Sequence, residues 1–509
     1  MSSSLPADPA SRSDRGATER GAPRLAVPVA LILLVAAGLR LPGLWTDFWL
    51  DEIWTWGLAV QVQQPWEIIT AIHADNNNHL NTLWLWICGP AAPLWLYRIH
   101  SFAAGLVTVG CAMALAARWS GGQRVAVLAA GLVAATSAVF VIYASEARGY
   151  SMAMAAAVGG QWVLGRAVRD NRRRDWFLAV VVALTGFLSH LSYLPVWLAQ
   201  VAWIALEWLA AAGWGGRWLR TLSGTAESGP SASRWRVQPL VAVGAVGCGV
   251  LLLYLVDLRL AGVGGGPELD PLIVSLDTLA EPFGAVDGAA KVVAALATLT
   301  LLVCGIGSAF RHTCGSRLEM VVPAAVLVIA PIVLFGMAPA GLVYPRHFLV
   351  SLSLALPVLG VGWVALVRQA GLARFVAVAI LVFWMVGNGL ALAGFFRDGR
   401  GGYTRALRDL ATDRPVGTVV LGSDHDFRNG MIIGFQRLRH PEFSRFEYRP
   451  QGQWPVEGVD ALILHDLAVT PSFADRLDVG GNAYHLVKTY RFSGPVGWHW
   501  ATYRRGGGE

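Results

Sequence analysis

Two adjacent carboxylates and two distant arginines are the side chains in this sequence best suited to chemistry on a phosphate. Asp51 and Glu52 lie in the stretch LPGLWTDFWLDEIWTW, directly after an apolar run. A carboxylate kept partly dry by aromatic neighbours is typical of a general base. Arg148 in YASEARGYS and Arg346 in VYPRHF carry planar guanidinium groups, which suit phosphate oxygens. These residues predict acid–base chemistry beside a phosphate.

Further polar residues lie in the same motifs or close to them. The supporting candidates are Tyr143, Glu146 and Arg98, and the candidates for the acceptor side or a lid are Asn78, His79, His190 and His347. His79 and Asp75 are four positions apart, which would place them on one helix face, so they are the candidate metal ligands. Asparagines surround this pair, and an Asn-rich turn explains the segment equally well, so a divalent metal is left open.

Structural roles compete with functional ones for several of these side chains. The two loop acids could be solvated or capping groups at a helix end. Glu146 and Arg148 could form an ion pair at a helix corner, and Arg346 could extend to anionic lipid headgroups. His190 could be an ordinary polar residue at a helix end.

The elements that would position these residues are membrane-spanning helices. Of 509 residues, 55% are hydrophobic and 14% are charged, whereas a soluble domain carries about 25% charge. This composition excludes a soluble globular enzyme and a disordered chain. The net charge of +7 comes from arginines between apolar runs, which indicates membrane topology and not nucleic-acid binding. About eleven apolar runs are long enough to span a bilayer. They cover 25–44, 97–117, 125–142, 150–166, 176–190, 193–212, 238–257, 289–309, 319–338, 347–367 and 374–396.

Arginine clusters between the runs predict the orientation of the chain. They fall at 118–124, 166–174, 217–236, 311–317 and 368–374, always in alternate loops on the side of the N-terminus. The positive-inside rule makes that side cytoplasmic, with residues 1–24 as a disordered cytoplasmic tail and residues 397–509 outside. The interrupted stretch 83–96 is too short to span, so we expect short horizontal helices within a first external loop, 45–96.

On this topology all the candidate residues face outward, and the helix centres carry almost no charge. An ion-coupled transporter would bury ionisable residues near the middle of the membrane. The sequence therefore favours a site open to the external leaflet. Residues 260–288, which include GVGGGPELDP, are expected to form a mobile external lid loop.

The last segment, 397–509, changes sharply in composition and predicts a small α/β domain. YTRALRDLATDR and SFADRL are expected to be helices. GTVVLGS, DALILHD, HLVKTYRF and HWATYRR are expected to be strands. His425 with Asp426, and His465 with Asp466, follow strands and are expected to be structural.

Taken together, the motifs resemble those of the GT-C class of membrane glycosyltransferases. Within it, the sequence is similar to bacterial relatives of dolichyl-phosphate-mannose-protein mannosyltransferases and of the lipid A aminoarabinose transferase. LWTDFWLDEIWT resembles their first-loop signature, YASEARGYS their Y-x-x-E-x-R corner, YRIHSFAAGL their arginine-led second helix, and VYPRHF their late arginine motif. Where relatives often have His-Pro-Pro, this chain has NNNHLNTLW, in which only His79 matches. The resemblance covers roughly 25–400 and implies a GT-C-like catalytic domain over 25–396.

This resemblance implies an inverting transfer of a sugar from a polyprenyl-phosphate donor to an acceptor hydroxyl, outside the plasma membrane. It implies that Asp51 is the general base, that Glu52 supports it or binds the donor, and that Arg148 and Arg346 hold the donor phosphate. The expected partners are the polyprenyl-phosphate sugar, the membrane, and a glycan, lipid or protein acceptor. No nucleic acid and no certain cofactor are expected.

Three other functions remain open from the sequence. A flippase or transporter for lipid-linked sugars would need a continuous polar path through the bundle. A non-catalytic protein that binds envelope glycans through 397–509 would tolerate loss of both loop acids. A glycan ligase or polymerase would use a diphosphate-linked donor.

Overall fold

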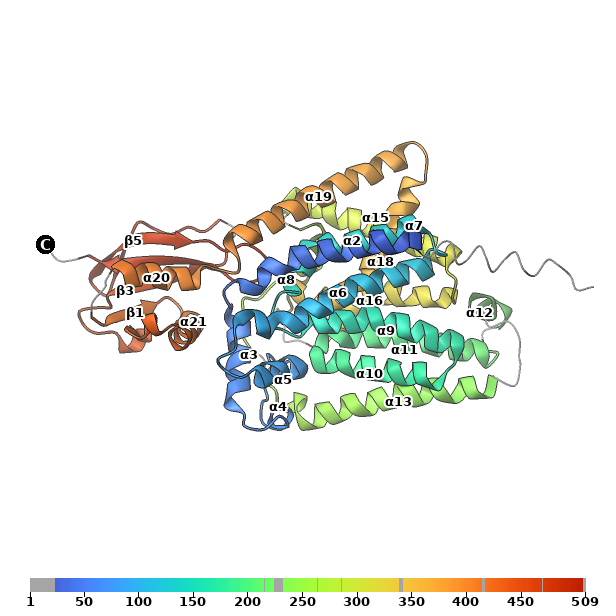
Figure 1. Cartoon of the computed structure of the whole chain (residues 1–509), viewed down its shortest axis with the longest axis horizontal. Coiled ribbons are helices and arrows are strands. Elements are labelled where there is room, and N and C mark those ends of the chain that lie inside the picture. Colours follow the sequence, from blue (N-terminus) through green and yellow to red (C-terminus); the bar gives the residue numbers. More distant parts are fainter. Residues whose placement is uncertain are drawn as a thin grey trace, which may run out of the picture.

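A bundle of long helices and a smaller α/β domain at one of its ends make up the protein (Figure 1). The computed structural model describes residues 23–214, 216–223, 232–262, 264–284, 286–337, 342–413, 417–468 and 470–506. The tail expected at 1–24 lies outside the described residues as far as position 22. The predicted fold class, a helical polytopic membrane protein with a small C-terminal α/β domain, is confirmed.

Seven helices within the described ranges are long and apolar enough to cross a membrane. They belong to α2 (Pro23–Arg40), α6 (Leu94–Trp119), α11 (Leu194–Ala211), α13 (Ala232–Val256), α15 (Ala289–His312), α16 (Val321–Met337) and α19 (Leu372–Asp398). An eighth span results if α17 with its preceding turn (Pro345–Ser353) and α18 (Ala355–Val367), bent by 65°, count as one.

The remaining bundle helices are shorter or more polar than these spans. They are α7 (Arg124–Thr136) with α8 (Ala138–Tyr143), α9 (Tyr150–Asp170) and α10 (Arg173–Ser189), and they lie alongside the long helices (Figure 1). Ser137 separates α7 from α8, and the free amide of Ala138 donates to the Asn388 side chain at 2.7 Å. Every apolar run expected from the sequence corresponds to one of these helices or helix pairs.

The first expected external loop contains three helices that cover one end of the bundle. These are α3 (Leu50–Gln61), α4 (Glu67–Thr70) and α5 (His79–Cys88). Gly89, with φ of 76°, ends α5, and Pro93 precedes α6, which explains why the stretch 83–96 does not span. The expected lid, 260–288, is not a loop throughout, because it includes α14 (Pro271–Ala280), capped by Asp270.

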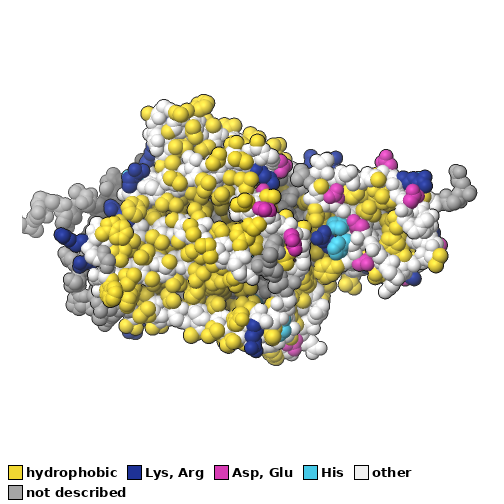
Figure 2. Space-filling model, turned by 180° about the vertical axis from the view of Figure 1, so that it is seen from behind, with side chains coloured by type: hydrophobic (Ala, Val, Ile, Leu, Met, Phe, Trp, Pro, Cys, Tyr) yellow, Lys and Arg dark blue, Asp and Glu magenta, His cyan; other side chains and the backbone are white. Residues whose placement is uncertain are grey.

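The two ends of the bundle differ in charge. Because successive helices alternate in direction, the expected arginine loops gather with α12 (Gly216–Ser223) at the end away from the α/β domain, called here the arginine end (Figure 1). There Arg118 pairs with Glu319 at 2.5 Å and Arg368 donates to Gln123 at 2.5 Å. Figure 2 shows Lys and Arg side chains at this end and a broad apolar belt over the bundle. The opposite end is called the domain end.

The C-terminal domain contains α20 (Tyr403–Asp413), α21 (Asp426–Arg439) and a six-stranded sheet of order β2-β1-β3-β6-β5-β4. Its strands are β1 (Val419–Ser423), β2 (Phe446–Tyr448), β3 (Ala461–Asp466), β4 (Arg476–Val479), β5 (Asn482–Tyr490) and β6 (His499–Arg505). The helix expected at SFADRL is wrong. Its last residues begin β4, because Gly480 and Gly481, both with positive φ, form a turn that pairs β4 with β5. Helix α21 was not expected.

Candidate active site

A buried ion pair fixes the chain just before the first candidate carboxylate. Glu52 and Arg98 are fully buried, and Arg98 donates from Nε to Oε1 (2.7 Å) and from Nη2 to Oε2 (2.6 Å) of Glu52. Nη1 of Arg98 also donates to the carbonyls of Gly43 (3.1 Å) and Thr46 (2.6 Å). Oε1 of Glu52 accepts from the amide of Ala147 at 2.7 Å. Since both of its oxygens are engaged, Glu52 is placed to hold the loop before α3 against the corner at Ala147.

Asp51 points to a different partner, in the second candidate motif. Its Oδ2 accepts from Nη1 of Arg148. The Arg148 guanidinium lies over the rings of Trp49 and Tyr150, with Cζ 5.9 and 5.4 Å from the ring centroids. The Asp51 side chain is 13% exposed and that of Arg148 is 5% exposed. Within the described ranges, Oδ1 of Asp51 has no hydrogen-bond partner, so this carboxylate keeps an oxygen that can accept a proton.

Arg346 reaches the same place from the start of the bent span. It lies in the short turn Pro345–Phe348, and its Cζ is 4.7 Å from the ring centroid of Tyr344. The side chain interacts electrostatically with Asp51 and Tyr150. Its Nε is buried without a hydrogen-bond partner, and no carboxylate in the described part of the chain lies within 4 Å. His347 lies beside Arg346, and its Nδ1 accepts from the amide of Tyr344 at 3.3 Å.

Aromatic side chains lie beside the Asp51–Arg148 pair. Tyr150 stacks on His190 with 4.0 Å between ring centroids and meets Tyr143 edge-on at 5.2 Å. Tyr143 and Tyr150 are buried, and His190 caps the turn Leu191–Tyr193 by accepting from the amide of Ser192 at 3.1 Å. The candidates Tyr143 and His190 are therefore neighbours of the Asp51–Arg148 pair through Tyr150.

Glu146 pairs with an arginine that the sequence did not single out. Arg400, just after α19, has its Nε 3.5 Å from Oε1 of Glu146, and both side chains are fully buried. Nη2 of Arg400 also donates to the carbonyls of Ile142 (2.9 Å) and Ser145 (3.0 Å). Burial raises the pKa of Glu146, although the Arg400 charge opposes this. An arginine in the turn directly after the last span was the available signal.

His79 likewise has a partner that the sequence did not indicate. Asp257, directly after α13, forms hydrogen bonds with two histidines. Its Oδ2 lies 2.6 Å from Nε2 of His79, and its Oδ1 lies 2.8 Å from Nδ1 of His73. The other candidate metal ligand, Asp75, instead accepts from the amide of Gly264 at 2.6 Å. No group of three or more His, Cys, Asp or Glu side chains placed to hold a metal ion occurs in the described ranges.

Asn78 lies at the edge of the site, where three segments meet closely. A Cβ on Gly149 would lie 2.9 Å from Asn78 Oδ1 and 1.7 Å from the carbonyl oxygen of Ser189. Only glycine allows the corner after Arg148 to approach α10 and the first loop this closely.

The C-terminal domain contacts the same end of the bundle. Asp47 accepts from the amide and hydroxyl of Thr404 at 2.8 and 2.7 Å, and Phe48 stacks on Phe435 of α21 at 5.6 Å. On the outer side, Tyr344 donates to the carbonyl of Pro267 at 3.0 Å. The expected lid segment and the domain therefore both contact residues that lie close to Arg346 and Asp51 along the chain.

His465 and His425 form a separate group within the domain. His465 Nδ1 bonds to Asp424 at 2.9 Å and its Nε2 to Arg428 at 2.8 Å, and His425 caps α21. Figure 2 shows His and Arg side chains together on this domain.

No protein-family model matches this chain, and no curated protein matches its sequence. Among solved structures, the chain is similar to ArnT from Cupriavidus metallidurans in the apo state, with a TM-score of 0.49, 12% identity, and coverage of 88% of this chain and 93% of ArnT. The same ArnT bound to undecaprenyl phosphate gives 0.49 and 12%, covering 95% and 98%. The Archaeoglobus fulgidus oligosaccharyltransferase in the apo form gives 0.45 and 10%, covering 86% and 69%.

Proposed function

We propose that this chain is a membrane glycosyltransferase that moves a sugar from a polyprenyl-phosphate donor to an acceptor hydroxyl, with Asp51 as the general base. One observation carries the proposal. Arg346 has no carboxylate partner in the described part of the chain. It lies beside the ion pair of Asp51 and Arg148, in which some hydrogen-bonding atoms have no partner. A surplus guanidinium at a largely dry site calls for an anionic ligand.

The charges around the site support this reading. Arg98 pairs with Glu52, Arg400 with Glu146, and Arg148 with Asp51. Arg346 remains, and both it and Arg148 have a buried Nε–H without a hydrogen-bond partner. A lipid phosphate would accept from these groups, and its tail would lie among helices that already face the membrane.

Phosphate binding would also prepare the base. When Arg148 turns part of its charge to the phosphate, Asp51 is less tightly held and can accept the proton of an acceptor hydroxyl. The acceptor oxygen then bonds to the anomeric carbon while the bond from that carbon to the phosphate oxygen breaks. The phosphate leaves with the electron pair, and the two guanidinium groups stabilise its charge.

The other residues have positioning roles in this proposal. Glu52 holds α3 through Arg98, and Glu146 holds the corner before Arg148 through Arg400. The arginine end lies in the cytoplasm by the positive-inside rule, so the reaction takes place on the extracytoplasmic face.

Transfer from a labelled polyprenyl-phosphate sugar in proteoliposomes tests the proposal. Asp51→Asn should lower the rate by about 10²–10⁴-fold, the usual contribution of a general base. Asp75→Asn is the matched control, because Asp75 is exposed in the same loop and its side chain accepts from Gly264 in the expected lid segment. Equal rates for Asp51→Asn and the wild type would remove Asp51 from the mechanism.

The structure bears on the transporter alternative. Polar side chains do connect across part of the bundle, from Tyr193 through Gln200 and Gln161 to Glu319, at 3.1–3.3 Å. These groups bond to one another directly, and the cavity beside Tyr193 and Gln200 holds about 30 Å³, roughly one water molecule. A sugar headgroup needs far more room, so this chain of contacts favours a structural role. The same variant tests the glycan-binding alternative, which predicts that Asp51→Asn leaves the binding of envelope glycans unchanged.

A further inference from the structure

An apolar groove lies on the bundle far from the candidate active site. It has a volume of about 640 Å³ and runs between α10 and α13. Its lining includes Arg173, Trp176 and Phe177 from α10, and Gln238, Val241 and Ala245 from α13. Arg173 begins α10 at the arginine end, so the groove opens at that end of the bundle.

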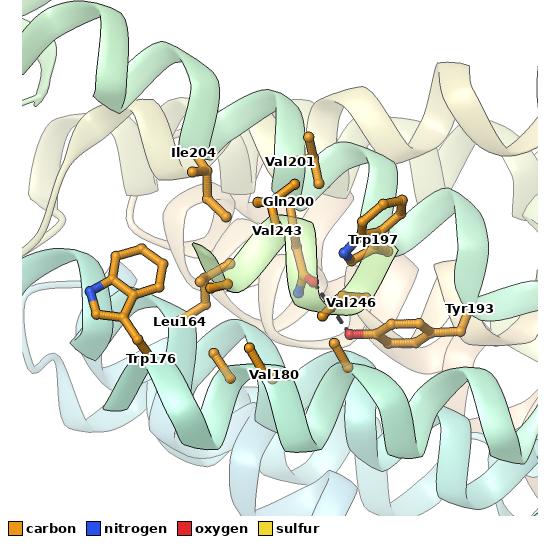
Figure 3. Close-up of a pocket in the computed structure, with 14 residues that line it drawn as sticks. Leu164, Trp176, Val180, Tyr193, Trp197, Gln200, Val201, Ile204, Val243 and Val246 are labelled. Carbon is orange, nitrogen blue, oxygen red and sulfur yellow. Dashed lines mark hydrogen bonds between the residues drawn. The ribbon is translucent and has the colours of Figure 1, made fainter. Parts of the chain in front are cut away.

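The groove continues inward as a narrow cavity, drawn in Figure 3. Trp176, Val180 and Ala242 line both spaces. This cavity, which reaches Tyr193 and Gln200, holds only about 30 Å³ in all, so the wide groove ends at Val180 on α10. From Arg173 to Val180, α10 rises by about 10 Å, which is less than half of a hydrocarbon core of about 30 Å. The groove therefore serves a single leaflet.

The groove mouth carries positive charge without a matching carboxylate. Arg172, Arg173 and Arg174 are exposed, and Arg174 and Arg166 share Asp175 at 3.8 and 3.2 Å. Arg173 has no ion pair within the described ranges. Deeper in, Oε1 of Gln238 is buried without a hydrogen-bond partner. An occupant needs an apolar chain, an anionic group at Arg173, and a hydroxyl donor for Gln238.

We propose that this groove binds one anionic glycerophospholipid from the leaflet at the arginine end. An acyl chain lies between α10 and α13, the phosphate contacts Arg173, and a headgroup hydroxyl donates to Gln238. This site is separate from the lipid-phosphate site proposed beside Asp51, because it opens at the opposite end of the bundle. It does not depend on the activity of the protein.

Native mass spectrometry of the full chain in detergent tests the site with two lipids of identical acyl chains. The wild type should retain one phosphatidylglycerol about tenfold more often than phosphatidylcholine, which corresponds to about 1.4 kcal/mol. Arg173→Gln should reduce this preference to near equality. Arg172→Gln removes the same charge from a residue that does not line the groove, and it should keep the preference.

A second pair of variants tests the apolar part. Ala245→Phe adds a ring to the groove from an exposed position and should abolish retention of both lipids. Ala379→Phe makes the same change on an exposed face of α19 and should retain lipid as the wild type does. Equal retention by Ala245→Phe and the wild type, or an unchanged preference in Arg173→Gln, would overturn the proposal. Displacement of the bound phosphatidylglycerol by polyprenyl phosphate would overturn the choice of lipid.

Discussion

Asp51 and Arg346 carry opposite charges and interact electrostatically, so their removal should change lipid-phosphate affinity in opposite directions. Arg346→Gln should weaken binding of polyprenyl phosphate by about 10–100-fold, since a charge-assisted hydrogen bond contributes about 1.5–3 kcal/mol. Asp51→Asn should leave affinity unchanged or raise it, because it removes a competing anion from Arg148. Microscale thermophoresis with polyprenyl phosphate measures both. A loss of affinity in Asp51→Asn would contradict this prediction, because it would show that the carboxylate helps to bind the phosphate through another group.

Two histidines in the C-terminal domain should make its stability depend on pH. Burial lowers the pKa of His499, and burial together with the Arg428 charge lowers the pKa of His425. Both use Nδ1 to accept a backbone amide, of Phe492 and Arg428 respectively, which requires the neutral ring. In the unfolded chain a histidine titrates near a pKa of about 6.5. The stability is therefore present above that pH and falls as the pH drops below it.

Thermal unfolding of the full chain between pH 8 and 5 measures this effect. The wild-type domain should lose stability below about pH 6.5, and His499→Gln, which keeps an acceptor but does not titrate, should lose less. His485→Gln is the control, because the imidazole of His485 is exposed on β5. Identical pH slopes for wild type and His499→Gln would show that His499 does not contribute.

Among individual residues, the sequence could identify those that lie in an unusual local motif. Asp51, Arg148 and Arg346 each lie in a distinct motif, and the structure brings them together. It could not identify Arg400 or Asp257, because their partners Glu146 and His79 lie 254 and 178 positions away. Buried ion pairs of this kind depend on how helices pack, which no local pattern records.

Helix packing in the bundle depends on glycines at close crossings. On α15, a Cβ at Gly305 would lie 2.2 Å from the carbonyl oxygen of Val358 on α18, whereas a Cβ at Gly307 would meet nothing within 4 Å. Such small residues let transmembrane helices approach each other. Gly305→Ala should lower stability by about 1–3 kcal/mol. Gly307→Ala should leave it unchanged or raise it by about 0.5–1 kcal/mol.

A scanning-fluorimetry comparison of the two variants in one detergent decides this prediction. A lower Tm for Gly305→Ala alone supports a tight α15–α18 crossing. Similar Tm values for both variants would contradict it.

The apolar spans were predictable, and so were short strands such as GTVVLGS and DALILHD, but the conformation of SFADRL was not. Apolar runs of spanning length identified the helices, since the bilayer requires about 20 apolar residues whatever the fold. SFADRL was expected to be a helix because its local pattern resembles one. Its last residues instead form a strand, because the turn at Gly480 and Gly481 and the neighbouring strand β5 decide its conformation.

Arg400 lies where the chain passes from the bundle into the α/β domain. This side chain is fully buried between the end of α19 and the corner at Glu146. Arg400→Gln would leave the Glu146 charge buried and unpaired, and breaking such a pair costs about 3–5 kcal/mol. We expect the domain to detach more readily, so that limited proteolysis of the full chain releases a fragment containing residues 403–506.

Arg397→Gln is the matched control for that experiment. Arg397 is three residues away, 70% exposed, and pairs only with its neighbour Asp398. Exposed pairs of this kind contribute about 0–1 kcal/mol, so cleavage should follow the wild-type rate. Equal cleavage of Arg400→Gln and Arg397→Gln would show that Arg400 does not couple the two parts.

The ion pair between Arg118 and Glu319 has a consequence for how the protein is made. The two residues are 201 positions apart, and ribosomes add about 5–20 residues per second. Arg118 therefore waits about 10–40 s in the translocating chain before its carboxylate is synthesised. During this interval Arg118 cannot form its ion pair with Glu319. A ribosome pause or a truncation before position 319 would leave an unpaired guanidinium in nascent protein, where membrane quality-control proteases could recognise it.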